Sequence, residues 1–240
     1  MTRDAQPAAA AGRPAAAGPD LFRGLDLPSR DDITASAARV RRGRGELLFR
    51  QGAAASSFYL LQEGRVKLTQ LTRDGQLVLL RLVVPGEALG GIAAFGNRTY
   101  PASAEAADDC LALAWNGRKI DLLLRRHPQL AINLIEYLAD RVHDMQARYE
   151  ELATQQVEQR LARAVLRLVQ RTGRRVDGGV LVDVRLSRQD LAEMTGTSMF
   201  SVSRILKRWQ ESGIIKSQRQ RILVRHPHGL VSIAENLPPA

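Results

Sequence analysis

Small polar and basic side chains recur at helical intervals in residues 186–209, whose sequence is LSRQDLAEMTGTSMFSVSRILKRW. Ser187 and Asp190 form an acidic version of the capping box, in which two side chains satisfy free amide donors at the start of a helix. Gly196 is able to adopt the positive φ of a tight turn, and Ser198 is a suitable cap for a second helix. This pattern predicts a helix-turn-helix, a motif that binds DNA.

The second predicted helix, residues 198–212, carries groups that suit the major groove of DNA. Arg204 has a guanidinium group that is able to bond guanine at two points or to hold a phosphate. The N-terminal end of a recognition helix enters the groove, so the residues there are expected to face base edges. These residues are Met199, Phe200, Ser201 and Ser203.

A second basic element follows the predicted recognition helix. Two short apolar runs, 214–215 and 221–225, flank a turn over 216–220 and predict a strand hairpin, the wing of a winged helix. Lys216, Arg219 and Arg221 are expected to contact phosphates, although exposed basic hairpins are common without that role.

Basic residues outnumber acidic ones by 35 to 25 in the 240-residue chain. Most of the surplus lies in residues 156–240, which contain 15 basic and 7 acidic side chains. A basic surface suits a polyanion such as nucleic acid, but it is more often plain solvated surface. Charge alone therefore does not decide between the two.

Cysteine content and hydropathy exclude several protein classes. Cys110 is the one cysteine, which excludes an internal disulfide and any iron–sulfur or zinc site built from four cysteines of one chain. No apolar run approaches the roughly 20 residues of a membrane-spanning helix, and the N-terminus lacks the apolar core of a secretory signal. We therefore expect a cytoplasmic protein without membrane contact.

Residues 39–115 consist of short apolar runs broken by glycines, a pattern typical of consecutive strands. The strands predicted at 65–72 and 76–83 flank an Asp-Gly pair that favours a tight hairpin. Several such strands predict an antiparallel barrel or roll. Gly90 and Gly91 lie where the backbone would approach a ligand closely, or where the chain makes an ordinary turn.

A helical pattern over residues 118–155 follows the strands. Its apolar positions alternate spacings of three and four, which is typical of a heptad seam and predicts a parallel dimer helix. The alternative is a long helix packed on its own domain. The seam positions are Ile135, Leu138, Val142, Met145, Tyr149 and Leu152.

These patterns predict an α+β fold in four parts. Residues 1–19, rich in Ala, Pro and Gly, are interpreted as a disordered tail. Residues 20–117 are expected to form a β-roll sensor domain, 118–155 the dimerisation helix, and 156–240 the winged helix-turn-helix domain. The last part begins with an amphipathic helix that ends near Gly173.

The order of these parts, over about residues 21–226, resembles the Crp/Fnr family of bacterial regulators. The most specific matches are 186–209 and the turn segment 85–95, PGEALGGIAAF. The resemblance implies a cyclic-nucleotide-binding-like β-roll and a homodimer on a palindromic operator of double-stranded DNA, with recognition helices roughly 34 Å apart. RNA polymerase is a further partner if the protein activates transcription.

By this resemblance the start of the first helix holds the DNA backbone, while Ser203 and Arg204 recognise bases. Family members commonly have Glu at position 200, where this chain has Phe200. A carboxylate accepts a hydrogen bond from cytosine and a phenyl ring does not, so Phe200 contacts a thymine methyl group or packs against Met199. The full expected DNA-binding set is Ser187, Arg188, Gln189, Ser198, Met199, Phe200, Ser201, Ser203, Arg204, Lys207, Arg219 and Arg221.

The sensor departs from the cyclic-AMP-binding pattern of the family. The Glu and the Arg-Ser pair of that pattern correspond to Gly91, Pro101 and Ala102, and a Thr-Ser pair on the dimer helix corresponds to Met145 and Gln146. A buried phosphate without a cation is costly, so cyclic AMP is not expected. An effector pocket, if present, is expected at Gly90, Gly91, Ala102, Ser103 and Met145.

Other effectors of the family stay open. An iron–sulfur cluster is not expected because the N-terminal cysteine cluster is absent. The segment 99–106, TYPASAEA, resembles the nitric-oxide-responsive denitrification branch, so haem is retained as a cofactor with His127 and His143 as candidate ligands. No metal site or catalysis is expected, because all four His lie outside 39–115. An effector-independent or architectural DNA-binding protein with a degenerate β-roll is the alternative function.

Overall fold

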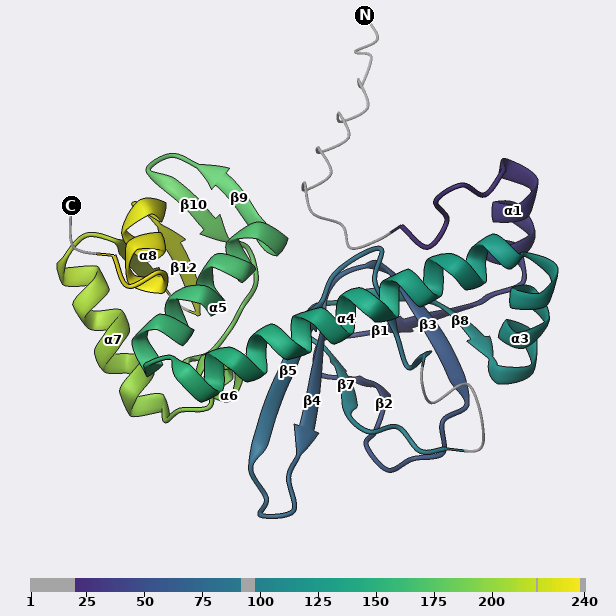
Figure 1. Cartoon of the computed structure of the whole chain (residues 1–240), viewed down its shortest axis with the longest axis horizontal. Helices are drawn as coiled ribbons and strands as arrows, with labels where there is room; N and C mark the ends of the chain where they lie inside the picture. Colours follow the sequence, from purple (N-terminus) through teal and green to yellow (C-terminus); the bar gives the residue numbers. More distant parts are fainter. Residues whose placement is uncertain (1–19, 92–97, 219, 238–240) are drawn as a thin grey trace, which may run out of the picture.

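The computed structural model describes residues 20–91, 98–218 and 220–237 (Figure 1). Its N-terminal half is a roll made of two four-stranded sheets, with strand orders β1-β8-β3-β6 and β2-β7-β4-β5. The pairs within both sheets are antiparallel. The strands are β1 Ala38–Arg42, β2 Leu47–Phe49, β3 Ser57–Glu63, β4 Val66–Leu71, β5 Leu77–Val83, β6 Ala88–Leu89, β7 Ser103–Ala106 and β8 Cys110–Asn116.

The hairpin of β4 and β5 forms as the sequence predicts. Val66 is opposite Val83 and Leu71 is opposite Leu77, with one register shift between these ends. Gly75 adopts a φ of 77° in the turn, a conformation that glycine reaches without a steric penalty. Apolar side chains that alternate along the strands face the interior of the roll, where Phe49 stacks on Tyr100 with ring centroids 4.0 Å apart.

Helices α1 (Leu27–Ala35), α3 (Gly117–Arg126) and α4 (Pro128–Thr154) pack against the roll. The single helix expected over 118–155 is therefore two helices. The break falls at His127, whose φ of −122° and ψ of 79° are not helical, because a residue before proline is displaced from the helical region. His127 Nε2 lies 2.8 Å from Asp32 Oδ2 and joins α1 to the break.

The C-terminal half combines helices with a third four-stranded sheet of order β11-β12-β10-β9. The core includes Leu161, Val165, Val202 and Trp209, which are buried. The elements are α5 Val157–Thr172, β9 Gly173–Val176, β10 Gly179–Val182, α6 Arg188–Thr195, α7 Met199–Glu211, β11 Ile215–Gln218, β12 Arg221–Val224 and α8 Pro227–Ala234.

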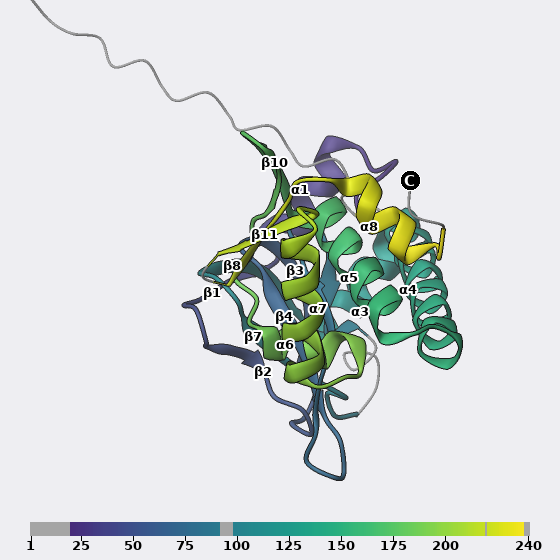
Figure 2. The same cartoon turned by 90° about the vertical axis from the view of Figure 1, so that its left-hand side faces the viewer.

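The two halves share a packed joint, which Figure 2 shows from the side of α6 and α7. Leu79 and Leu82 of β5 belong to the same buried cluster as Leu161 and Leu191 of the C-terminal half. Lys67 Nζ of β4 also forms an ion pair with Asp190 of α6. The β-roll therefore holds the first helix of the predicted DNA-binding motif directly.

Within the part of the chain that the structure describes, no helix has both the length and the apolar character needed to cross a membrane.

Candidate nucleic-acid interface

Helix α6 starts with the capping box that the sequence predicts. The backbone N–H of Asp190 donates to Ser187 Oγ at 3.0 Å, and the N–H of Ser187 donates to Asp190 Oδ2 at 2.7 Å. Gly196 ends the helix in the left-handed region with a φ of 61°. Ser198 then caps α7 by accepting the N–H of Ser201 at 3.1 Å. The helix-turn-helix prediction is confirmed in these local details.

Helix α7 has two faces of opposite character. The buried face carries Val202, Ile205, Leu206 and Trp209, at spacings that place them on one side of an α-helix. The opposite face has the same spacing and consists of Phe200, Ser203, Arg204 and Lys207, which are exposed or half-buried. This opposite face, called the reading face below, points away from the core.

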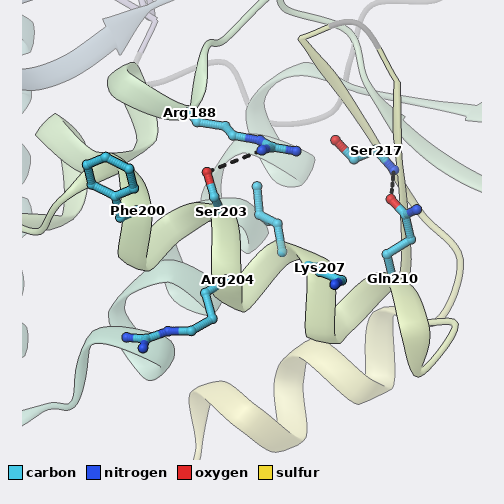
Figure 3. A pocket seen from close by; sticks show the side chains of 8 residues that line it. Arg188, Phe200, Ser203, Arg204, Lys207, Gln210 and Ser217 are labelled. Atoms are coloured by element: carbon cyan, nitrogen blue, oxygen red, sulfur yellow. Dashed lines mark hydrogen bonds between the residues drawn. The ribbon is translucent and has the colours of Figure 1, made fainter.

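Two basic side chains border the reading face at its centre. Arg188 Nη1 of α6 donates to Ser203 Oγ at 3.2 Å, which links the starts of the two helices. Arg204 has no ion-pair partner among the described residues, and its side chain is exposed. Both side chains, together with Phe200, Lys207 and Ser217 of the wing, line a hollow of about 430 Å³. Figure 3 shows the side chains that line it.

Other residues of the expected DNA-binding set have intramolecular partners. The hydroxyl of Ser187 is committed to Asp190 in the capping box, and the amide of Gln189 donates to Glu193 at 3.0 Å. Arg188 is the cation among these three residues at the start of α6, and its side chain donates to Ser203. Met199 is exposed, like Ser198 at the cap.

The wing differs in detail from the sequence-based expectation. Lys216 is part of strand β11 and not of the turn, because β11 continues to Gln218 in register with β12. Arg221 Nη1 lies 3.6 Å from Asp183 Oδ1, which neutralises part of its charge. Arg219 lies outside the described residues. Gln210 Oε1 accepts the N–H of Ser217 at 3.3 Å and ties α7 to the wing, a contact the sequence did not suggest.

The predicted heptad seam forms an apolar stripe on α4. Met145 and Tyr149 are 70% and 76% exposed, which is unusual for such large apolar side chains in a single chain. Leu138 is partly buried against the roll, so one edge of the stripe packs on its own domain. The other exposed members are Ile135, Val142 and Leu152.

The expected effector residues lie in the roll and on α4. Gly90 adopts a φ of 75°, and an added Cβ would lie 2.8 Å from the carbonyl oxygen of Ser57, so close packing explains this glycine. Ala102 is buried and carries no charge, and Ser103 Oγ already accepts the N–H of Gln51 at 2.9 Å. Met145 belongs to the apolar stripe of α4.

The two candidate haem ligands lie apart. His127 has its Nε2 beside Asp32, and this hydrogen bond holds the pKa of the Asp32 carboxyl below its usual range. His127 therefore has a structural partner at the α3–α4 break. His143 is exposed on α4. In residues 20–91, 98–218 and 220–237, no three His, Cys, Asp or Glu side chains gather as a metal site would require.

Sequence reasoning missed an ionic cluster between the two halves. Glu87, only 2% exposed, forms ion pairs with Arg81 of β5, Arg141 of α4 and Arg171 of α5. Its Oε2 also accepts the N–H of Val84 at 3.0 Å. One buried carboxylate thus joins the roll, the long helix and the DNA-binding domain. These three arginines and Glu87 are called the Glu87 cluster below.

Further arginines lie beside the Glu87 cluster. Arg167 pairs with Glu151 at 2.5 Å, and Arg148 donates to the carbonyl oxygen of Leu80. Burial lowers the pKa of Arg148 to about 10, and the nearby positive charges of Arg167 and Arg171 add to this effect. The joint therefore concentrates cations that have structural partners.

Comparisons with known proteins agree with this architecture. Residues 39–127 match the family model of the cyclic nucleotide-binding domain, and residues 159–233 match the Crp-like helix-turn-helix domain. The Cyclic AMP receptor protein of Thermus thermophilus is 32% identical over 221 residues, which are 92% of this chain and 99% of that protein. The Transcriptional activator protein anr of Pseudomonas aeruginosa is 26% identical over 213 residues, 87% and 84% of the two chains.

A solved structure also resembles the whole architecture. A CRP-family transcriptional regulator from Thermus thermophilus superposes with a TM-score of 0.71 at 28% identity, over 84% of this chain and 99% of that one. The roll, the long helix and the winged helix-turn-helix occur here in the order that these relatives share. The chain therefore belongs to the Crp/Fnr family of DNA-binding transcription regulators.

Proposed function

We propose that this protein is a sequence-specific transcription regulator that binds a two-fold symmetric operator as a homodimer. Each α7 enters the major groove with its N-terminal end, and Arg188 and Lys207 hold the flanking phosphates. The observation that supports this most strongly is the reading face of α7. It places Arg204 beside the open hollow without a carboxylate partner among the described residues.

Dimerisation through α4 is supported by the exposed apolar stripe. Val142, Met145 and Tyr149 expose large apolar surfaces that a second copy of the helix would cover. Burying a fully exposed side chain of this size stabilises an assembly by about 1.5–3 kcal/mol. A symmetric contact along the stripe is the arrangement that places two recognition helices on one operator.

Footprinting on sequences selected from random DNA tests the function. A dimeric regulator is expected to protect one palindrome with half-sites about 10 bp apart. The architectural alternative would protect DNA diffusely. Sedimentation of Met145→Glu tests the dimer: the variant should be monomeric, whereas Leu122→Glu, on an exposed site of α3, should sediment like the unaltered protein.

The proposed effector is a small ligand other than cyclic AMP. The Thermus relative carries cyclic AMP in its name, but Pro101 and Ala102 lie where the phosphate-binding pair of that pattern would be. Arg141, on the nearby long helix, is engaged by Glu87 and by Asp144. A cyclic phosphate would thus enter without a dedicated cation, which is unfavourable in a buried site.

Ligand titration followed by thermal melting tests this proposal. Cyclic AMP at millimolar concentration is expected to leave the melting temperature unchanged, since only a ligand that binds the folded state raises it. An absorption spectrum of the anaerobically purified protein, recorded before and after haem is added, tests whether the protein binds haem. A clear upward shift with cyclic AMP would overturn the effector assignment.

A further inference from the structure

Among the described residues, Phe200 is the most exposed large apolar side chain, at 79%. Its neighbour Met199 is 42% exposed, so the two side chains do not bury each other. The buried face of α7 is already filled by other apolar residues, and the phenyl ring has no place in that core. Phe200 and Met199 therefore leave apolar surface exposed at the start of α7.

The position of Phe200 indicates which molecule would contact this surface. Phe200 is the second residue of α7, at the end of the helix that enters the groove in this motif. Figure 3 shows its ring on the same side of the helix as Ser203, with Arg188 beyond it. In the proposed complex with DNA, the ring would therefore lie in the major groove.

The chemistry of the ring narrows the choice of base. A phenyl group offers no polar hydrogen-bonding atom to the donors and acceptors that distinguish guanine, cytosine and adenine in the major groove. The apolar feature of the major groove is the 5-methyl group of thymine, which phenylalanine contacts favourably. We propose that Phe200 specifies thymine by packing against this methyl group, an inference that rests on the proposed DNA-binding function.

Thymine-to-uracil substitution tests the contact because it removes only the methyl group and keeps the base pair. The operator is first selected from random duplexes with the unaltered protein, and each thymine is then replaced singly by deoxyuridine. At one thymine in each half-site the dissociation constant should rise about fourfold, the effect of removing one buried methyl group.

Two variants make the test specific for the ring. Phe200→Ala should bind the thymine and uracil duplexes equally, and its melting temperature should be unchanged because the ring is exposed. Leu122→Ala, at an exposed site of α3, is the control and should retain the fourfold difference.

Each failure has a distinct meaning. If the unaltered protein selects no sequence, the proposed function is wrong and this inference falls with it. If it selects an operator but ignores every uracil substitution, or if Phe200→Ala keeps the difference, only the thymine contact is wrong. Phe200→Ala could also weaken binding to a protein partner while responding to uracil as the unaltered protein does. That result would show that the ring contacts a protein, and it would overturn the proposal.

Discussion

Two regions of the molecule are rich in arginine and use it in opposite ways. At the joint between the halves, Arg81, Arg141 and Arg171 surround the buried carboxylate of Glu87. On the reading face of α7, Arg204 is exposed and has no ion-pair partner among the described residues. An arginine that is buried beside a carboxylate stabilises the fold. An exposed arginine without a carboxylate partner is available to bind DNA.

This contrast changes how the basic C-terminal end is interpreted. Of its cations, Arg167 and Arg171 face the long helix and the roll, and Arg208 pairs with Glu158 at 2.8 Å. Arg167 and Arg171 are thus engaged at the joint, and Glu158 neutralises part of the charge of Arg208, whose side chain is 59% exposed. The composition therefore overstates the surface that binds DNA.

The largest expected effect is on the Glu87 cluster. Glu87→Gln keeps the shape of the side chain but leaves three arginines without their shared negative charge. Breaking a buried ion pair costs about 3 kcal/mol or more, which lowers the melting temperature of a chain of this size by roughly 6–12 °C. Asp121→Asn, at an exposed ion pair with Arg125, should change it by far less. Equal melting temperatures for the two variants would show that the Glu87 cluster stabilises the fold no more than an exposed ion pair does.

The ion pair of Lys67 and Asp190 should have a smaller effect. Lys67→Met removes the charge from β4 while Asp190 keeps its hydrogen bonds to Ser187. Because both partners are mostly but not fully buried, we expect a loss of about 1–2 kcal/mol, measured by thermal melting. Hydrogen exchange in α6 should also become faster, since one of the contacts that hold this helix to the roll is lost. Lys216→Met, at an exposed site of β11, serves as the control. If exchange in α6 stays unchanged, the pair does not link the roll to the helix.

Lys207 tests the DNA-binding role of the reading face. Lys207→Ala should weaken binding to every duplex by a similar factor and reduce the slope of log affinity against log salt by about 1 for each half-site. Its contact with Glu211, 3.7 Å away, is exposed and contributes little to stability. Arg118→Ala, at an exposed site of α3, should leave the slope unaltered. A loss confined to one operator sequence would mean that Lys207 recognises a base.

The smallest effect is expected at Asp32. The hydrogen bond from His127 lowers the pKa of this carboxyl from 3.8, so the ionised form is favoured in the folded state. The stabilisation is therefore present above about pH 4 and is lost as the pH falls through the lowered pKa. Asp32→Asn should lower the melting temperature slightly at pH 7, and the difference should shrink as the pH falls below 3.8. A difference that stays constant as the pH is lowered would show that the pair acts through packing.

Local features of the fold were predictable from sequence, and contacts between distant segments were not. The capping box at Ser187 and the Asp-Gly hairpin depend on neighbouring residues, and both form as expected. The helix start at Pro128 was predictable from the proline itself, although the continuous helical periodicity favoured one helix over 118–155. Lys67 and Asp190 are 123 positions apart, and no local pattern connects them.

The same limit applies to the candidate site. The buried and exposed faces of α7 follow from helical periodicity, so the reading face was predictable. The commitment of Ser187 and Gln189 to partners within α6 was not, since a hydroxyl or an amide next to a cap suits either DNA or the helix itself. Separating the two uses of arginine likewise required knowing which carboxylates are buried beside them.

The affinity of Arg204→Ala at fixed salt tests most directly whether the reading face of α7 binds operator DNA. Against the selected operator, we expect affinity to fall about fivefold or more, because a bidentate arginine contact contributes about 1–3 kcal/mol. The melting temperature should stay unchanged. Arg125→Ala, an equal loss of charge on helix α3, should bind like the unaltered protein. Unchanged affinity of Arg204→Ala for both operator and random DNA would contradict the claim.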